Sequence, residues 1–302
     1  MTRVMVVMAP DPYIALMYKK FYDQNWKDEV DGLLVQVNGC NREVVDFIAD
    51  LYKDETVIKH YDHSNQGIGF DELIKLVPDD TDVLMTTCSD NFIFQKGVVK
   101  NMASNIGMYD VVGSTGLHAS PPDVADEIKD KIGFCRVNPF MSFWNYRKLK
   151  EIDFTFQAVD KRKGSLIESL NYECQKDVGL DVMTEMSIKY MSLGNKALVI
   201  NDDDPPKYIH ASGLSSAVYG HLVYPDGVNN LAGTTRNSFD CRISKDTLAW
   251  LLTCYLETWQ DCPLEEFNAD YWEALIRKIK RAGSSLDEIK ALALKRKELW
   301  QS

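Results

Sequence analysis

The stretch that decides the fold is Asp82-Val-Leu-Met-Thr-Thr-Cys-Ser-Asp-Asn-Phe-Ile-Phe94. Its apolar, β-branched run from Val83 to Thr87 predicts a strand that is buried on both faces. The run ends in the small or polar residues Cys88 to Asn91, after which apolar residues resume and a helix is expected. In an open α/β sheet, ligands bind outside the carboxyl ends of the strands, where a carboxylate can hold a divalent cation. Asp90 is therefore a candidate metal ligand, although an aspartate here could also simply cap the following helix.

Strand-like and helix-like patterns alternate on both sides of this stretch. Before it, they predict strands at 3–8, 33–37 and 56–61, helices from about 13 and over 44–51, and a glycine-containing loop at 63–70 leading into a helix at 71–76. After it, they predict a helix near 95–105, strands at 109–112, 133–137 and 197–200, and a helix over 181–193. The pattern indicates a surface loop with one short helix at 114–131 and a buried apolar segment at 141–149, whereas 154–179 gives only a weak signal and includes a loop around 161–164. This alternation indicates an α/β fold with a mostly parallel, twisted sheet flanked by helices.

The carboxyl-terminal part has a purely helical pattern. It predicts helices over 246–260, 268–281 and 285–300, and the last of these begins with the capping box Ser285-x-x-Glu288. We therefore expect two parts, an α/β domain at 1–240 and a helical extension at 241–302.

Composition and cysteine usage limit the classes of protein that fit. With 302 residues, 45% of them hydrophobic and 26% charged, the chain resembles an ordinary globular protein. No apolar run approaches the ~20 residues that span a bilayer, and the amino terminus is typical of a first strand rather than a signal peptide. The seven cysteines contain no C-x-x-C pair, which argues against a disulfide framework or a zinc site. We therefore expect a cytoplasmic protein.

Charge is unevenly distributed along the chain. The net charge is −11, but residues 271–302 carry eight Lys or Arg against four acids, a net +4, so residues 1–270 carry −15. An acidic body disfavours non-specific binding to nucleic acid or anionic lipid, whereas the basic tail could contact either. The tail could equally be a set of packed helices with a solvated basic face.

Five short motifs follow one another in an order that suggests a family. They are Met8-Ala9-Pro10-x-x-Tyr13, Val37-Asn38-Gly39, Asn65-x-Gly67-x-Gly69, Cys88-Ser89-Asp90, and Tyr208-Ile-His210 followed by Ser212. This order resembles the GT-A fold of nucleotide-sugar-dependent glycosyltransferases, particularly the inverting, family-2-like enzymes. The resemblance covers about residues 3–216 and implies a nucleoside-diphosphate sugar as donor, most often a UDP-sugar.

The resemblance also implies the residues that contact the donor. Pro10 and Tyr13 match the first turn that contacts the nucleotide, and Asn38 stands where the family usually has an acid beside the base. An Asn-Gly pair is also simply a good turn, so that interpretation of Asn38 stays open. The remaining implied donor contacts are Asn65, Gly67, Gly69, Asp90 and Ser212.

For the metal, the resemblance implies Mn²⁺ or Mg²⁺ bound by Asp90 and His210. Asp90 matches the last residue of the family's Asp-x-Asp motif, while Cys88 replaces the first aspartate, a departure that puts metal binding in question. His210 matches a second protein ligand in many of these enzymes, although a single histidine can also be purely structural.

The general base implied by the resemblance is Asp181, at the start of the helix that precedes the last strand. The family usually has Glu-Asp there, whereas this chain has Leu180-Asp181. Asp181 could also be a helix cap, and Glu185, one turn later on the same face, is the reserve candidate.

The sequence thus predicts a metal-dependent, inverting glycosyltransferase with an unknown acceptor, bound on the side of segments 114–131 and 155–179. A hydroxymethylated base in phage DNA is one further acceptor option, and it rests only on the basic tail. A sugar-nucleotide nucleotidyltransferase is the first alternative, although Pro10 to Tyr13 lacks the Gly-rich, basic loop of those enzymes. The second alternative is a GT-A-like module that binds without catalysis, which the Cys88 substitution favours.

Overall fold

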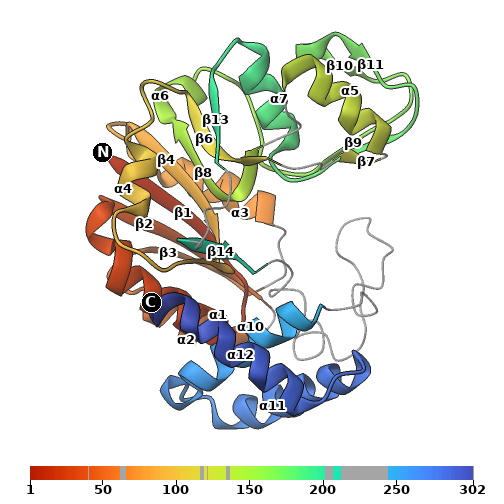
Figure 1. Ribbon diagram of the computed structural model, residues 1–302. Coiled ribbons are helices and arrows are strands. Elements are labelled where there is room, and N and C mark those ends of the chain that lie inside the picture. The colour runs from red at the N-terminus through yellow and green to blue at the C-terminus, as the bar shows by residue number, and fades with distance from the viewer. Residues whose placement is uncertain are drawn as a thin grey trace.

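The computed structural model describes residues 1–39, 41–61, 66–115, 119–120, 122–133, 137–200, 207–211 and 244–301 (Figure 1). Its centre is a seven-stranded sheet with the order β13-β6-β8-β4-β1-β2-β3. These strands are β1 (Thr2–Met8), β2 (Gly32–Asn38), β3 (Thr56–His60), β4 (Val83–Cys88), β6 (Val111–Thr115), β8 (Val137–Asn145) and β13 (Ala197–Val199). β8 runs antiparallel to its neighbours β4 and β6, and the other pairs are parallel. The predicted fold class, a mostly parallel sheet flanked by helices, is confirmed.

The central strands of the sheet are buried on both faces, as the apolar runs predict. All six residues of β4 are buried. Along β1, Val4 and Val6 belong to one hydrophobic core and Met5 and Val7 to the other, which is the two-residue alternation of a strand between two layers. The covering helices are α1 (Pro12–Phe21), α2 (Arg42–Leu51) and α4 (Val98–Ala103) on the first core, and α3 (Gln66–Leu73), α6 (Tyr146–Leu149) and α7 (Thr184–Ser192) on the second.

Local capping explains where several helices begin. Asp11 accepts hydrogen bonds from the backbone N–H groups of Tyr13 and Ile14, and Pro12 follows it at the first helical position of α1. Asn41 caps α2 in the same way. The predicted cap at Ser285 is confirmed, because its hydroxyl accepts from the N–H of Glu288.

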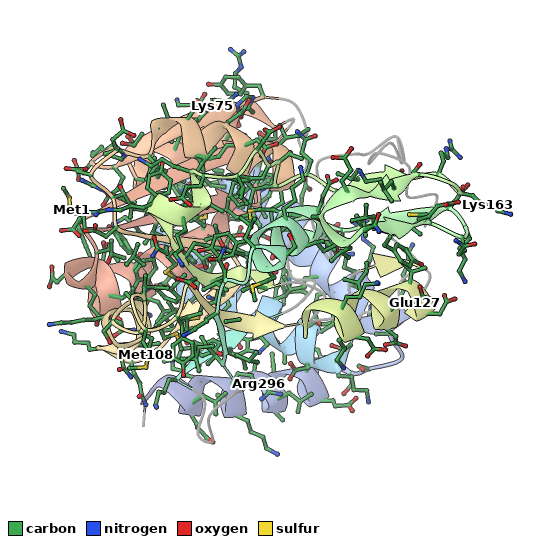
Figure 2. All side chains as sticks on the ribbon, turned by 90° about the horizontal axis from the view of Figure 1, so that it is seen from above. Met1, Lys75, Met108, Glu127, Lys163 and Arg296 are labelled. Atoms are coloured by element: carbon green, nitrogen blue, oxygen red, sulfur yellow. The ribbon has the colours of Figure 1, made fainter. Side chains whose placement is uncertain are left out.

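A small lobe stands apart from the central sheet. It contains α5 (Pro122–Ile132) and the short strands β7 (Ala119–Ser120), β9 (Val159–Lys161), β10 (Leu166–Ile167), β11 (Tyr172–Glu173) and β12 (Val178–Leu180). In Figure 2 it carries the labels Glu127 and Lys163, at the opposite end of the view from Met1. The weak pattern over 154–179 does not reveal these strands, because strands of two or three residues are too short to show a hydrophobic period.

The helical extension consists of α10 (Lys245–Thr258), α11 (Glu265–Arg281) and α12 (Leu286–Gln301), close to the predicted ranges. These helices share the core of α1 and α2 and lie beside them in Figure 1. Trp250 of α10 stacks on Phe94, with ring centroids 6.2 Å apart. The predicted domain boundary at 240 falls outside the described residues and stays a prediction.

Three other local predictions need correction. α3 begins at Gln66, so Gly67 and Gly69 are helical rather than in a loop. A strand, β5 (Asn91–Ile93), comes directly after Asp90, where the pattern predicts none, and the helix expected near 95–105 is α4. β8 is one nine-residue strand across 137–145, where the pattern predicts a strand only at 133–137. In the described part of the chain, no helix has the length and apolar character to cross a membrane.

Candidate functional site

The carboxyl end of β4 meets the end of β1 at the edge of the sheet where ligands bind in open α/β folds. The N–H of Ala9, just after β1, donates to the hydroxyl of Ser89 over 3.2 Å. Asp90 is only 5% exposed and is followed directly by β5. No helix starts at Asp90, so the helix-cap interpretation of this residue is wrong.

A late strand returns to Asp90. β14 (Tyr208–His210) pairs antiparallel with β5, and its register places His210 opposite Asn91. The next residue, Ala211, donates its N–H to the carbonyl of Asp90 over 2.9 Å. The backbone segments that carry the two predicted metal ligands are therefore adjacent.

Some parts of the predicted site cannot be described in the same way. Asn65, Ser212 and the side chain of His210 lie outside the described residues. Within the part of the chain that the structure describes, no group of three or more His, Cys, Asp or Glu side chains is arranged to hold a metal ion.

The two predicted glycines have packing roles that the structure makes explicit. A Cβ on Gly67 would lie 2.5 Å from the Cα of Gln157, and a Cβ on Gly69 would overlap the side chains of Gln36 and Val7. Both positions therefore need glycine for close packing of α3 on its neighbours. This packing is a sufficient reason for the Gly-x-Gly pattern without any phosphate.

The predicted nucleotide contacts are buried. Asn38 ends β2 and is 4% exposed, with His60 opposite it on β3. Pro10 is also buried, in the turn before α1. Tyr13 is wholly buried, and its hydroxyl hydrogen-bonds to the side chain of Asn268 on α11. Tyr13 thus contacts the helical extension, and we leave it out of the donor site proposed below.

One buried carboxylate near this edge escaped the sequence analysis. Asp11 is 2% exposed, and Tyr271 of α11 donates to it over 2.9 Å. Burial raises the pKa of this carboxyl to about 6, even though its hydrogen bonds to Ile14, Tyr271 and Tyr13 act in the opposite direction. The signal that could have found it is Asp-Pro before a helical pattern, which is typical of a helix cap.

Asp181 and Glu185 lie on either side of a strained turn. Asp181 is exposed, and its carboxylate accepts the N–H of Val182 over 2.8 Å. Met183, at the start of α7, is wholly buried and has a φ of 64°, in the left-handed region. Glu185 forms an ion pair of 2.8 Å with Lys161 of β9, and its side chain is 15% exposed.

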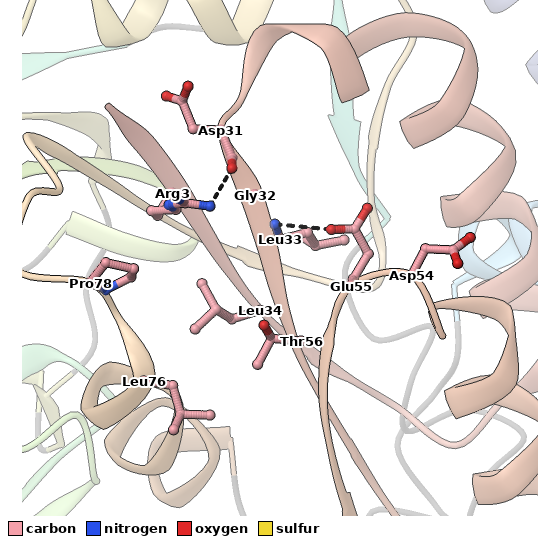
Figure 3. A pocket seen from close by; sticks show the side chains of 10 residues that line it. All are labelled: Arg3, Asp31, Gly32, Leu33, Leu34, Asp54, Glu55, Thr56, Leu76 and Pro78. Atoms are coloured by element: carbon pink, nitrogen blue, oxygen red, sulfur yellow. Dashed lines mark hydrogen bonds between the residues drawn. The ribbon is translucent and has the colours of Figure 1, made fainter.

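A cavity of about 380 Å³ lies at the other edge of the sheet (Figure 3). Its lining includes Arg3, Leu33 and Thr56, near the starts of β1, β2 and β3. Arg3 donates to the carbonyl of Asp31, and Glu55 accepts the N–H of Leu33 over 3.4 Å. Because it lies at the amino ends of the parallel strands, this cavity is separate from the predicted donor site.

Comparison with known proteins gives only distant likenesses. No protein-family model matches the chain, and no curated protein matches it. It is similar to S. aureus TarS, with 16% identity and a TM-score of 0.44 over 97% of this chain and 83% of that one. It is also similar to a mannosyltransferase from Pyrobaculum calidifontis in complex with GDP-Man and Mn²⁺, with 11% identity and a TM-score of 0.43 over 100% of this chain and 80% of that one.

A third similar structure is a 4-diphosphocytidyl-2C-methyl-D-erythritol synthase from Anaerococcus prevotii. The identity is 7% and the TM-score 0.33, over 49% of this chain and 72% of that one. All three identities are below 25% and all three TM-scores are below 0.5. These likenesses by themselves assign neither a family nor an activity to this chain.

Proposed function

We propose that this protein is a glycosyltransferase that moves a sugar from a nucleoside-diphosphate sugar to an acceptor hydroxyl and uses a divalent cation. The observation that carries the proposal is the pairing of β14 with β5, which brings His210 to the backbone of Asp90 at the carboxyl end of β4. These are the two residues that the family resemblance implies as metal ligands, and they come from distant parts of the chain.

The ligand chemistry fits Mn²⁺ better than Mg²⁺. Asp90 offers carboxylate oxygens and His210 an imidazole nitrogen, and Mn²⁺ accepts both kinds of ligand more readily than Mg²⁺ does. Cys88 stands where the resemblance implies a second carboxylate, and its sulfur accepts a hydrogen bond from the side-chain amide of Gln66. When bound, the cation would neutralise negative charge on the departing diphosphate.

Proton transfer is the task proposed for Asp181. Its carboxylate is exposed beside the small lobe, where an acceptor hydroxyl could reach it. As the acceptor oxygen bonds to the anomeric carbon and the nucleoside diphosphate leaves, the hydroxyl proton moves to Asp181. Glu185 is the weaker candidate, because its carboxylate is already engaged in an ion pair with Lys161.

We propose that the acceptor binds on the side of the small lobe and that the basic tail contacts it if it is anionic. Three exposed cations of α11, namely Arg277, Lys280 and Arg281, form no ion pair among the described residues. In contrast, Arg296 and Lys297 of α12 pair with Asp246 and Glu257 of α10. If the acceptor is anionic, a nucleic acid for example, α11 is the helix that we propose to contact it.

A binding module without catalysis is the second candidate, and Cys88 is the observation that favours it. A thiol is a poor substitute for a carboxylate toward Mn²⁺, so the site could bind a nucleotide and yet lack turnover. Such a module would bind the donor but neither transfer nor hydrolyse its sugar.

A donor screen separates these possibilities. The full chain is incubated with UDP-, GDP- and CDP-activated sugars, with Mn²⁺, with Mg²⁺ or with excess chelator, and both binding and slow hydrolysis are measured. The glycosyltransferase proposal expects metal-dependent binding of one donor and release of its nucleoside diphosphate. Binding without any hydrolysis or transfer would favour the module, and turnover undiminished by chelator would refute the metal site.

A further inference from the structure

We propose that Asp71 is a positioning residue that holds the turn carrying Asp181. Its carboxylate fixes the segment 155–157, and this segment in turn fixes Met183, two residues after Asp181. The inference rests on the proposed function, because it assigns Asp71 a part in presenting Asp181 to the acceptor. Asp71 itself lies on α3 and contacts none of the atoms that react.

Asp71 binds three consecutive residues at once. One carboxylate oxygen accepts the N–H of Phe156 over 2.7 Å, and the other accepts the side-chain amide of Gln157 over 2.8 Å. The hydroxyl of Thr155 also donates to the carboxylate. Hydrogen bonds to a charged acceptor are roughly twice as strong as neutral ones, so this single side chain anchors the whole segment.

Close packing also holds the segment against α3. Gly67 of α3 approaches it so closely that an added Cβ would lie 2.8 Å from the carbonyl oxygen of Phe156. The Phe156 ring is wholly buried against Phe70 of the same helix, with ring centroids 5.5 Å apart. The segment is therefore held to α3 by both hydrogen bonds and close packing.

The same segment holds the turn before α7. The carbonyl of Phe156 accepts the N–H of Met183 over 2.9 Å. Met183 has a φ of 64°, which costs of order 1–3 kcal/mol for a non-glycine residue and persists only where the surroundings enforce it. The hydrogen bond from Met183 to Phe156 helps to hold Met183 in this conformation. The direction of the chain at Asp181, two residues earlier, depends on that hydrogen bond.

α3 also reaches the donor side. Its first residue, Gln66, donates its side-chain amide to the sulfur of Cys88, two residues before Asp90. One rigid helix thus contacts the end of β4 at one point and, through Asp71, the turn of Asp181 at another. This arrangement fixes the distance between the proposed metal ligand and the proposed base.

The test combines exchange of backbone amides with kinetics, using Asp71→Ala, the milder Asp71→Asn, and Asp50→Asn as a control on the exposed face of α2. In Asp71→Ala, the amides of Phe156 and Met183 should exchange faster, while amides of β1 and β4 stay protected. Donor affinity should stay within about twofold, whereas kcat for transfer should fall by roughly 10²-fold, as a misplacement of about 1 Å can cause. Asp71→Asn should show the same changes to a smaller degree, and Asp50→Asn none.

A double variant shows whether Asp71 acts through Asp181. Asp71→Ala combined with Asp181→Asn should be no slower than Asp181→Asn alone, because the first change can only misplace a base that the second has removed. If the losses in kcat of the two single variants multiply in the double variant, the inference is wrong. It is also wrong if the backbone amide of Met183 exchanges at the wild-type rate in folded Asp71→Asn. If the wild-type chain transfers no sugar from any donor, the proposed function fails, while the exchange measurement still decides whether Asp71 holds the turn.

Discussion

The hydroxyl of Tyr271 donates a hydrogen bond to the buried carboxylate of Asp11 over 2.9 Å, although the two residues lie near opposite ends of the chain. Asp11 caps α1, directly after the turn where the first strand reaches the ligand-binding edge. The rings of Tyr13 and Tyr271 are also in contact, with centroids 4.3 Å apart. The helical extension is therefore joined to the first turn of the α/β fold by both polar and aromatic contacts.

The buried Asp11 predicts an unusual dependence of stability on pH. Burial raises its pKa to about 6 in the folded protein, above the usual value near 3.8, so the folded chain binds a proton that the unfolded chain has lost. The contribution of Asp11 to the free energy of unfolding should therefore fall as pH rises from about 4 to about 6, by about 3 kcal/mol in total. In urea unfolding, the free energy of unfolding of Asp11→Asn, measured relative to that of wild type, should increase as pH rises from 4.5 to 7.

Asp46 provides a control in which the dependence of stability on pH has the opposite sign. Its hydrogen bond from Lys59, and then that from Tyr61, lowers the pKa of this exposed carboxyl, so the interaction stabilises the fold above the normal pKa and is lost in acid. Asp46→Asn should therefore lose stability relative to wild type at pH 7 and not at low pH. An Asp11→Asn curve that stays parallel to wild type would contradict the assigned pKa.

Asp90→Ala should remove metal-dependent donor binding. Asp90, which is only 5% exposed, is the carboxylate that we propose as a metal ligand at this edge. Titration calorimetry with the nucleoside diphosphate, with and without Mn²⁺, should show that the variant no longer responds to the metal. Cys88→Asp, which adds oxygen ligands, should leave that response intact or strengthen it. A metal response that survives in Asp90→Ala would place the metal elsewhere.

Asp181→Asn should slow transfer without weakening donor binding. The amide keeps the shape of the side chain but cannot take a proton, so kcat should fall by roughly 10²–10⁴-fold. Steady-state kinetics and donor titration measure the two quantities separately. If Asp181→Asn is active and Glu185→Gln is inactive, the role belongs to Glu185. Activity in both variants would refute an inverting mechanism with either carboxylate as base.

The two basic helices should respond differently to neutralisation. Replacing Arg277, Lys280 and Arg281 by Gln should leave the melting temperature nearly unchanged but raise KM for an anionic acceptor and flatten its dependence on salt. Replacing Arg296 and Lys297 should instead lower stability by ~0.2–1 kcal/mol per ion pair, because these cations bind acids of α10. An unchanged salt dependence in the α11 variant would show that the helix does not contact the acceptor.

The sequence could predict those helices and strands that are marked by a hydrophobic pattern or a cap within their own residues. β4 was predictable from one β-branched apolar run, and α12 from its capping box and its period. Asp90 was recognisable as a candidate site residue because it follows a buried strand, and its role as a metal ligand stays a prediction. The strands of the small lobe were not predictable, because β10 and β11 have two residues each and depend on packing with α5 and α7.

Long-range contacts account for the rest of what was missed. Tyr13 has the sequence position of a nucleotide contact, but its surroundings are supplied by Tyr255, Phe267 and Tyr271. In the sequence, Asp71 has the pattern of an ordinary helix residue, and its partner Thr155 lies more than eighty residues later in the chain. No periodicity or spacing in one sequence reports such pairs, because they depend on segments that meet only in the folded state.

The pairing of β14 with β5 also sets the order in which the protein can assemble. The two strands are more than a hundred residues apart, and closing a loop of that length costs about 4 kcal/mol of conformational entropy. Among the residues that the structure describes, three residue pairs and two flanking backbone hydrogen bonds are gained in return, so the pairing should form late and open first. β1, β2, β3 and β4 are all complete at Cys88, whereas the proposed site needs the chain as far as Ala211. A nascent chain released before that point should fold its first strands and helices and still bind no donor.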